Sequence, residues 1–300
     1  MIREIAGHHN HSVKLARKLQ RKKFRRERGL LVGEGMDLLA AAVAGGADVR
    51  EILVRKELLR EVPAGLREQA AAFSGPAAAR GRGAAPADED SVSEGVDIGV
   101  CDQATLDQAS SLGGSADVIF ICLQPEGRLA DIDLGSGLVF YLDGVGDPGN
   151  VGTLARAAVA FGLSGVICSP GTADPWSPKA LRAGMGAQFS LPVVTEVEAS
   201  DLQGRFAALK AKGQPLPRVV VADSHGGADV REVVAGGPAS GSVPAGPSAG
   251  VTLVLGSERT GPSAAWKGAE RVMIPQRRFD SLNVAMAGTV LAYEFSRGRG

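Results

Sequence analysis

The chain of 300 residues carries 33 basic and 33 acidic side chains and is 44% hydrophobic, as expected for a globular protein long enough for two domains. Its three cysteines show no CxxC spacing and give no metal-ligand pattern with its four histidines, which argues against a metal site and predicts buried thiols in a reducing compartment. No run reaches the ~18 apolar residues of a membrane span, and the first residues lack the apolar core of a signal peptide. We therefore expect a cytoplasmic protein without a membrane segment and without a metal.

Positive charge is concentrated at the start of the chain. Residues 1–30 hold ten Lys and Arg against two Glu, most of them in KLARKLQRKKFRRERG. The apolar Val13, Leu15, Leu19 and Phe24 are too few for a wide buried stripe, so we expect a basic helix that mostly faces outward. Such a face is either solvated or binds a polyanion, and this charge density favours nucleic acid. The candidate RNA-binding residues are Lys14, Arg17, Lys18, Arg21, Lys22 and Arg25.

The rest of the first half predicts a small α/β unit. The segment 33–54 predicts a helix, a glycine-rich turn and a strand at Arg50–Val54, and VDIGVCD and DVIFICLQ are further strand candidates. Residues 74–95 are biased to Ala, Gly, Pro and charge, which predicts a mobile insertion. We expect an N-terminal domain over 1–125 and a linker over 126–137.

The second half, 138–300, has a different pattern. Its strand candidates are continuous apolar runs separated by helical patterns, which is typical of a parallel sheet covered by helices on both faces. A second low-complexity loop occupies 235–250, and an apolar stripe in the last helix predicts packing along the sheet or against a partner subunit. The runs are LVFYLD, GVICSP, FSLPVV, RVVVAD, VTLVLG and RVMIP, and the stripe is Leu282, Ala285, Met286, Thr289, Val290 and Tyr293.

A GxGxxG pattern, Gly144 to Gly149, follows the first of these runs. A dinucleotide site also needs an acidic residue at the end of the next strand, but that strand ends in Ser-Pro-Gly. Within the pattern, Asp147 would repel a pyrophosphate, and Pro148 has no amide hydrogen to donate to it. The pattern therefore argues against a nicotinamide- or flavin-dependent oxidoreductase.

The segment DPGNVGTLARAA predicts a helix that starts at Val151, with Asn150 as its cap. Arg156 lies off its apolar stripe and is either a solvated surface residue or placed to reach a phosphate or a ribose hydroxyl. Two later segments favour the second interpretation. One places Gly-Ser-Glu after VTLVLG, and the other places Ser-Leu-Asn at a helix start capped by Asp280 or Ser281. All three lie at the carboxyl ends of predicted strands, where ligands bind in open α/β sheets.

Together these segments resemble the SpoU-type RNA ribose 2′-O-methyltransferases of the SPOUT superfamily. The family's first motif, N-x-G-x-x-x-R, matches Asn150, Gly152 and Arg156. The second, G-x-E after a strand, matches Gly256 and Glu258, and the third matches Ile274-Pro275 and Ser281-Leu282-Asn283. Residues 177–193 resemble the family's connecting segment, and the N-terminal part resembles its ribosomal-protein-like RNA-binding module.

The resemblance implies a C-terminal α/β domain with a parallel sheet and a trefoil knot, preceded by a smaller α/β RNA-binding domain. It implies S-adenosylmethionine as cofactor, no metal, and a homodimer formed through the C-terminal knot domain. The implied catalytic residues are Asn150, Arg156, Glu258, Ser281 and Asn283. The implied cofactor-binding residues are Leu255, Gly256, Ser257, Ile274 and Leu282.

The resemblance and the basic N-terminal segment predict an S-adenosylmethionine-dependent RNA 2′-O-ribose methyltransferase acting on ribosomal RNA. The alternatives are a transfer-RNA 2′-O-methyltransferase and a catalytically inactive SPOUT-like RNA-binding protein. The family mechanism makes Arg156 the base, but a free arginine has a pKa above ~12 and is a poor base. Our hypothesis is that Arg156 stabilises the developing alkoxide and orients the adjacent phosphate, while Glu258 holds either that guanidinium or Asn150.

Overall fold

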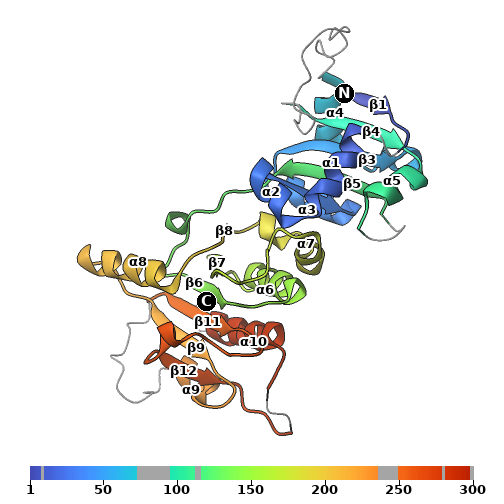
Figure 1. The fold of residues 1–300 in the computed structure, drawn as a ribbon. Helices are drawn as coiled ribbons and strands as arrows, with labels where there is room; N and C mark the ends of the chain where they lie inside the picture. Colours follow the sequence, from blue (N-terminus) through green and yellow to red (C-terminus); the bar gives the residue numbers. More distant parts are fainter. Residues whose placement is uncertain (8–9, 73–94, 112–115, 236–248, 279–280, 298–300) are drawn as a thin grey trace. The chain divides into compact units, whose positions relative to one another are not determined.

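The computed structural model describes all residues except 8–9, 73–94, 112–115, 236–248, 279–280 and 298–300 (Figure 1). The predicted insertion at 74–95 and the low-complexity loop at 235–250 therefore lie almost entirely outside the described residues. The chain forms two compact units. Unit 1 comprises Met1–Pro125 and Trp176–Phe189, and unit 2 comprises Glu126–Pro175 and Ser190–Gly300.

Unit 1 contains a five-stranded mixed sheet in the order β1-β4-β3-β5-β2. β1, β4 and β3 are mutually parallel, whereas β5 runs antiparallel to both β3 and β2. The strands predicted around Arg50–Val54, in VDIGVCD and in DVIFICLQ are confirmed, whereas β1 and β2 were not predicted. The strands are β1 (Ile2–Glu4), β2 (Leu30–Glu34), β3 (Val49–Arg55), β4 (Asp97–Cys101) and β5 (Val118–Leu123).

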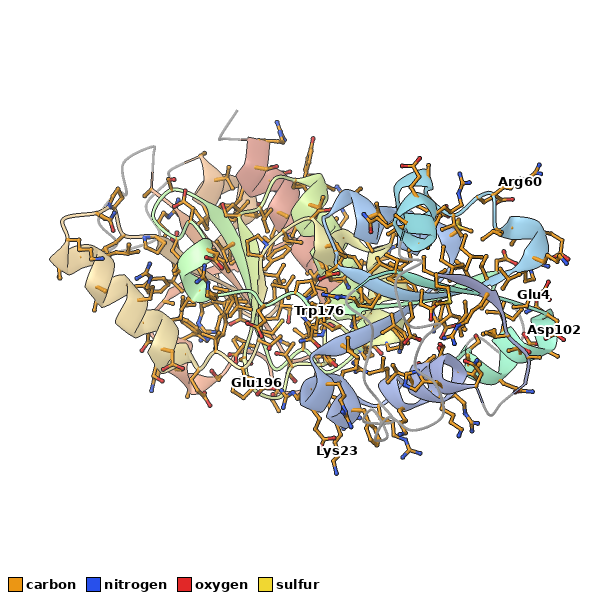
Figure 2. All side chains as sticks on the ribbon, turned by 90° about the horizontal axis from the view of Figure 1, so that it is seen from above. Glu4, Lys23, Arg60, Asp102, Trp176 and Glu196 are labelled. Carbon is orange, nitrogen blue, oxygen red and sulfur yellow. The ribbon has the colours of Figure 1, made fainter. Side chains whose placement is uncertain are left out.

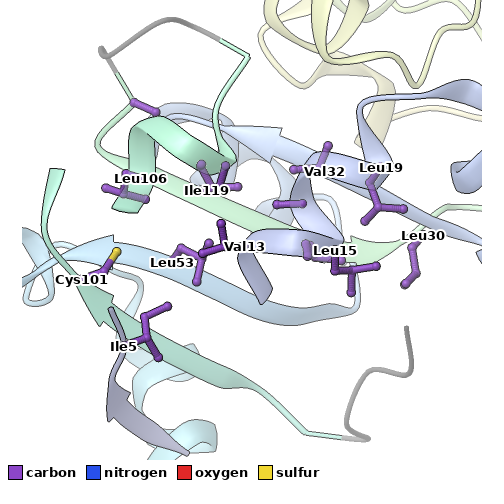
Figure 3. Packing of buried hydrophobic residues seen from close by; sticks show 14 residues of the cluster. Ile5, Val13, Leu15, Leu19, Leu30, Val32, Leu53, Cys101, Leu106 and Ile119 are labelled. Atoms are coloured by element: carbon purple, nitrogen blue, oxygen red, sulfur yellow. The ribbon is translucent and has the colours of Figure 1, made fainter. Parts of the chain in front are cut away.

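Helices cover the sheet of unit 1, and α1 and α5 contribute to one buried cluster with β2, β3 and β5 (Figure 3). Val13 and Leu19 from α1 and Leu106 from α5 are fully buried in this cluster. The helices are α1 (His11–Leu19), α2 (Lys22–Arg28), α3 (Met36–Ala44), α4 (Ala64–Ala72), α5 (Gln103–Ala109) and α7 (Pro178–Gly184), with 3-10 turns η1 (Lys56–Leu58) and η4 (Ala187–Phe189).

The basic segment differs from the single outward-facing helix that we predicted. It forms two helices, and α1 buries Ser12, Val13, Leu15, Ala16 and Leu19. Small residues at positions 12 and 16 widen the stripe, because Ser and Ala also fit against the sheet. The charged side chains are thus confined to the opposite face of α1 and to α2.

The segment Trp176–Phe189 was predicted to lie in the C-terminal domain, but it packs with unit 1. The Trp176 and Phe189 rings lie 5.7 Å apart, and both side chains are buried. A Cβ added to Gly45, at the end of α3, would lie 2.3 Å from the Phe189 carbonyl oxygen. This close approach is invisible in the sequence because it joins residues far apart in the chain. The domain division 1–125, 126–137 and 138–300 otherwise stays a prediction.

Unit 2 contains a seven-stranded sheet in the order β10-β12-β9-β11-β6-β7-β8, and every pairing in it is parallel. All six predicted strands are present, and β10 was not predicted. The strands are β6 (Leu138–Asp143), β7 (Gly165–Cys168), β8 (Val193–Val194), β9 (Arg218–Ala222), β10 (Ala228–Asp229), β11 (Val251–Gly256) and β12 (Glu270–Met273). The trefoil knot stays a prediction, since strand order does not trace how the chain threads.

Helices cover both faces of this sheet, which explains the continuous apolar runs. Phe140 of β6 faces α10 near Gly288, while Tyr141 lies in the opposite cluster and contacts the Trp266 ring at 5.0 Å. α6 and α10 lie side by side (Figure 1). The elements are α6 (Pro148–Ala160), α8 (Ala199–Ala211), α9 (Val230–Val234) and α10 (Val284–Arg297), with 3-10 turns η3 (Leu129–Asp131) and η5 (Ala264–Trp266).

Within one chain, the last helix buries a stripe that shares Ala285 with the predicted one, while packing of the predicted stripe against a partner subunit stays a prediction. Its buried residues are Ala285, Gly288, Leu291, Ala292 and Phe295. Three members of the predicted stripe, Met286, Val290 and Tyr293, are 63%, 37% and 46% exposed. Small residues at 285, 288 and 292 let α10 pack closely on α6 and β11, so the larger side chains turn outward.

Candidate active site at the carboxyl ends of the parallel strands

The first motif lies on the loop from β6 into α6. The helix starts at Pro148, and Asp147 caps it by accepting a hydrogen bond from the Asn150 amide at 3.1 Å. Asn150 is therefore not the cap that we predicted, because Asp followed by Pro is itself a favourable helix start. Its carboxamide is left to bond elsewhere.

Asn150 instead joins the other two motifs. Its Nδ2 donates to Glu258 Oε1 at 2.7 Å, and its Oδ1 accepts from Asn283 Nδ2 at 3.1 Å. The second Glu258 oxygen accepts from the Gly146 amide at 3.4 Å. Of the two partners proposed for Glu258, the structure shows Asn150 and not Arg156. The first motif thus meets two motifs that lie more than 100 residues further along the chain.

Asn283 also caps the last helix. Its Oδ1 accepts from the amides of Ala285 and Met286 at 2.9 and 3.3 Å. The cap is therefore Asn283, where we predicted Asp280 or Ser281; Asp280 lies outside the described residues. A single asparagine both starts α10 and orients Asn150, which couples the position of the helix to the site.

The second motif forms a tight loop after β11. The Gly261 amide donates to the Ser257 carbonyl at 2.9 Å, so the chain folds back over Gly256. A Cβ at Gly256 would lie 2.2 Å from the backbone nitrogen of Pro262, so this position excludes any larger residue. The Ser263 amide donates to Asp143 Oδ2 at 2.7 Å and ties the end of the loop to β6.

A cavity of about 630 Å³ opens at this edge of the sheet, within the size range of small-molecule sites. Its wall includes every predicted cofactor-binding residue and three of the predicted catalytic residues: Leu255, Gly256, Ser257, Ile274 and Leu282, with Glu258, Ser281 and Asn283. Gln276 also lines it, and its Oε1 is buried without a hydrogen-bond partner among the described residues. The cavity therefore offers both apolar contact and an unused acceptor.

Sequence reasoning missed a second polar group in the cavity wall. Asp223, Ser224 and His225 follow β9, and Arg271 lies on the neighbouring β12. The signal that could have found Asp223 is its position directly after the apolar run RVVVA, at the same sheet edge as the motifs.

Arg156 is not part of the cavity wall of this chain. Its side chain is exposed on α6, off the buried stripe of Val151, Leu154, Ala155 and Ala158, as predicted. Among the described residues it has no hydrogen-bond or ion-pair partner. The structure therefore joins Asn150, Glu258 and Asn283 but leaves Arg156 apart from them within one chain.

The glycine pattern does not form a phosphate cradle. Asp147 caps α6, and the Gly146 amide that would bind a pyrophosphate faces the Glu258 carboxylate. A phosphate at this position would meet two carboxylates, so the geometry agrees with the argument against a dinucleotide.

The predicted RNA-binding residues divide into two groups. Lys14, Arg17, Arg21 and Lys22 are exposed and Lys18 is half-buried. Their neighbour Lys23 points away from α2 (Figure 2). Arg25 is wrongly grouped with them: it is 2% exposed, and its Nη1 donates to the carbonyls of Leu19 and Gln20 at 2.8 and 3.0 Å. It satisfies the open carbonyls at the end of α1 and faces the protein.

The three cysteines are buried and form no disulfide, and burial raises the pKa of the Cys101 thiol to about 11. Within the described ranges, no group of three or more His, Cys, Asp and Glu side chains has the arrangement of a metal site. In that same part of the chain, no helix has the length and apolarity to cross a membrane.

Comparison with known proteins identifies the family. Residues 137–293, more than half of the chain, match the SpoU rRNA Methylase family. The chain belongs to this family. Residues 10–80 match the MRM3-like substrate binding domain. This SpoU-family protein is thus an RNA methyltransferase, with the α/β fold that the motifs predicted.

Its relatives extend the comparison beyond the catalytic domain. The chain is 29% identical over 295 residues to the 23S rRNA (guanosine(2553)-2′-O)-methyltransferase RlmP of Bacillus subtilis, covering 97% of this chain and 98% of that one. It is 34% identical over 155 residues to a 23S rRNA (uridine(2479)-2′-O)-methyltransferase of Streptomyces viridochromogenes, covering 51% and 50%.

Solved structures are similar to nearly all of the chain. The SpoU methyltransferase AviRb of Streptomyces viridochromogenes, in complex with AdoMet, has a TM-score of 0.75 at 25% identity, covering 97% of this chain and 99% of that one. An AdoMet-bound rRNA methyltransferase of Sinorhizobium meliloti has a TM-score of 0.73 at 26% identity, covering 99% and 98%.

Proposed function

We propose that this SpoU-family protein transfers a methyl group from S-adenosylmethionine to a ribose 2′-hydroxyl of ribosomal RNA. The observation that carries the proposal is the hydrogen-bonded chain Glu258–Asn150–Asn283 at the cavity edge. The names of the relatives support ribosomal RNA, and the AdoMet-bound neighbours support the cofactor.

The residues of the cavity fit the cofactor. Leu255, Ile274 and Leu282 offer apolar surface to an adenine ring. Gln276 Oε1, which has no partner among the described residues, can accept a hydrogen bond from an amino group. Gly256 and Ser257 supply backbone groups beside it. When bound, S-adenosylmethionine supplies a methyl group on a positively charged sulfur.

The remaining chemistry falls to the chain's own residues. Transfer needs the ribose oxygen in line with the methyl group, and such orientation supplies up to ~10 kcal/mol. The Glu258–Asn150–Asn283 chain gives the cavity edge fixed hydrogen-bonding groups, with Ser281 beside them to contact substrate or cofactor. Arg156 stabilises the developing alkoxide and orients the neighbouring phosphate, and the proton leaves to water or phosphate.

A second copy of the chain supplies Arg156 in this proposal. Arg156 does not line its own cavity, and the exposed apolar residues Met286, Val290 and Tyr293 of α10, with Val159 of α6, form a face suited to a partner. A homodimer through the C-terminal domain covers this face and brings α6 of one copy to the other.

The basic face of α1 and α2 supplies phosphate affinity that does not depend on sequence. Recognition of the target then depends on RNA shape or an unpaired loop. A substrate of this kind makes the cytoplasm the proposed compartment.

Methyl transfer to purified RNA tests the proposal. Ribosomal and transfer RNA from a strain lacking this gene are incubated with the protein and labelled S-adenosylmethionine, and the 2′-O-methylated positions are mapped. We expect one labelled position in ribosomal RNA. Label in transfer RNA alone would establish the transfer-RNA alternative, and RNA binding without label would establish the inactive binding protein.

A further inference from the structure

The group that follows β9 has no role in the function proposed above. Asp223, Ser224, His225 and Arg271 line the cavity but belong to none of the three motifs. β9 and β12 are paired in parallel with Val221 opposite Arg271, so Asp223, two residues after Val221, lies on the same face as Arg271.

Hydrogen bonds hold this group in place. Arg271 Nη1 pairs with Asp223 Oδ2, and Asp223 Oδ1 accepts from the His225 amide at 2.9 Å. The Ser224 hydroxyl lies 2.9 Å from His225 Nδ1. Burial acts to raise the pKa of Asp223, but the His225 amide and the Arg271 guanidinium outweigh it and lower that pKa, so the carboxylate is charged.

The two side chains present opposite charges to one ligand. The Asp223 side chain is 18% exposed and that of Arg271 is 41% exposed, so both keep surface for further contacts. A guanidinium has five N–H donors, of which the pair uses one, and a carboxylate has further lone pairs. Among the described residues of the cavity wall, the other carboxylate is Glu258, which is already engaged by Asn150 and Gly146.

We propose that the Asp223–Arg271 pair binds the amino-acid end of S-adenosylmethionine, with Arg271 contacting the α-carboxylate and Asp223 the α-ammonium group. This inference rests on the proposed function. An amino-acid end carries one negative and one positive charge on adjacent atoms, which matches a fixed pair of opposite charges. The ribose hydroxyls of the cofactor are neutral, so binding them would not require the positive charge of Arg271.

Two ligands that differ only in this end test the inference. S-adenosylhomocysteine carries the amino-acid end, whereas 5′-methylthioadenosine lacks it and keeps adenine, ribose and sulfur. Their dissociation constants are measured by calorimetry for the wild-type protein, Arg271→Gln and Asp223→Asn. The control is Arg231→Gln, which breaks a comparable Arg–Asp pair outside the cavity.

We expect Arg271→Gln and Asp223→Asn to raise the dissociation constant of S-adenosylhomocysteine at least tenfold and that of 5′-methylthioadenosine less than twofold. Arg231→Gln is expected to change neither. Retained 5′-methylthioadenosine binding shows in the same experiment that each variant is folded.

Other outcomes overturn the inference in distinguishable ways. The inference is wrong if both cavity variants keep their affinity for S-adenosylhomocysteine, or if both ligands lose affinity equally. In either case the pair does not bind the amino-acid end, and the proposed function still stands. A wild-type protein that binds neither ligand overturns the proposed function and the inference with it.

Discussion

At the scale of single residues, Arg156 is the group whose role depends most on its surroundings. It is exposed and without a partner among the described residues, yet it occupies the arginine position of the first motif. Because it contacts neither the cavity nor the Glu258 carboxylate in one chain, we expect it to act on the RNA and not on the cofactor.

Replacing Arg156 with Ala should therefore slow methyl transfer about 10²–10³-fold, the usual cost of one lost charge-stabilising donor. S-adenosylhomocysteine affinity should change less than twofold. Single-turnover kinetics and calorimetry measure the two, with Lys210→Ala, an exposed cation on α8, as control. Equal losses in rate and cofactor affinity would contradict a role of Arg156 on the RNA. A near-normal rate in Arg156→Lys would show that only the positive charge is needed, and not the guanidinium geometry.

Gly256 is constrained by backbone and not by a flexible side chain. The Cβ of Gly256→Ala would meet the Pro262 nitrogen at 2.2 Å, so the loop of the second motif must shift. We expect a loss of about 1–3 kcal/mol in unfolding free energy, as for other overpacked sites, together with weaker cofactor binding. Gly146→Ala, which meets nothing within 4 Å, is the matched control in urea denaturation. Equal unfolding free energies of the two variants would show that the loop of the second motif can shift at no cost in stability.

At the scale of elements, two arginines that follow α1 have different environments. Arg25 donates to the last carbonyls of α1 from inside the protein, whereas Arg21 lies at the break with its side chain exposed. Although both lie in the same basic segment, we expect Arg25 to stabilise the fold and Arg21 to be available for RNA.

Alanine substitutions should separate the two purposes. Arg25→Ala should lower the unfolding free energy by about 1–3 kcal/mol, because buried carbonyls lose their donor. Arg21→Ala should leave stability unchanged and reduce the slope of log K against log salt for RNA binding by ~0.7 if it contacts one phosphate. Denaturation and salt titration of RNA affinity measure both. A reduced salt slope in Arg25→Ala with full stability would reverse the assignment.

At the scale of the whole molecule, the exposed row on α10 bears on assembly. Met286, Val290 and Tyr293 follow helical spacing, and the Phe161 ring lies 5.8 Å from that of Tyr293. The opposite face of α10 is already packed within the chain. Because the exposed row is apolar, we expect this row to pack against a second copy of the protein.

If the α10 row joins two copies, Val290→Glu should leave the protein monomeric, because the introduced carboxylate would be desolvated in the interface. If the partner supplies Arg156, methyl transfer should fall at least 100-fold while S-adenosylhomocysteine still binds. Light scattering gives the mass, and Leu216→Glu, another exposed apolar position, is the control. A monomeric wild-type protein, or an active Val290→Glu monomer, would contradict the arrangement.

The sequence by itself determined every strand of unit 2 except β10, the α3 and α10 helices and the three motif segments. These follow from apolar runs, helical periodicity and residue spacing, which are local properties of the chain. The motifs also predicted which strand ends would meet, because parallel strands place their carboxyl ends at one edge.

Only the tertiary structure decided which surface each element buries and which polar atoms meet. It turned Met286 and Val290 of α10 outward, buried Arg25, placed residues 176–189 in unit 1, and joined Asn150 to both Glu258 and Asn283. Each of these depends on contacts between residues distant in the chain, where close packing selects among faces that the sequence leaves equivalent.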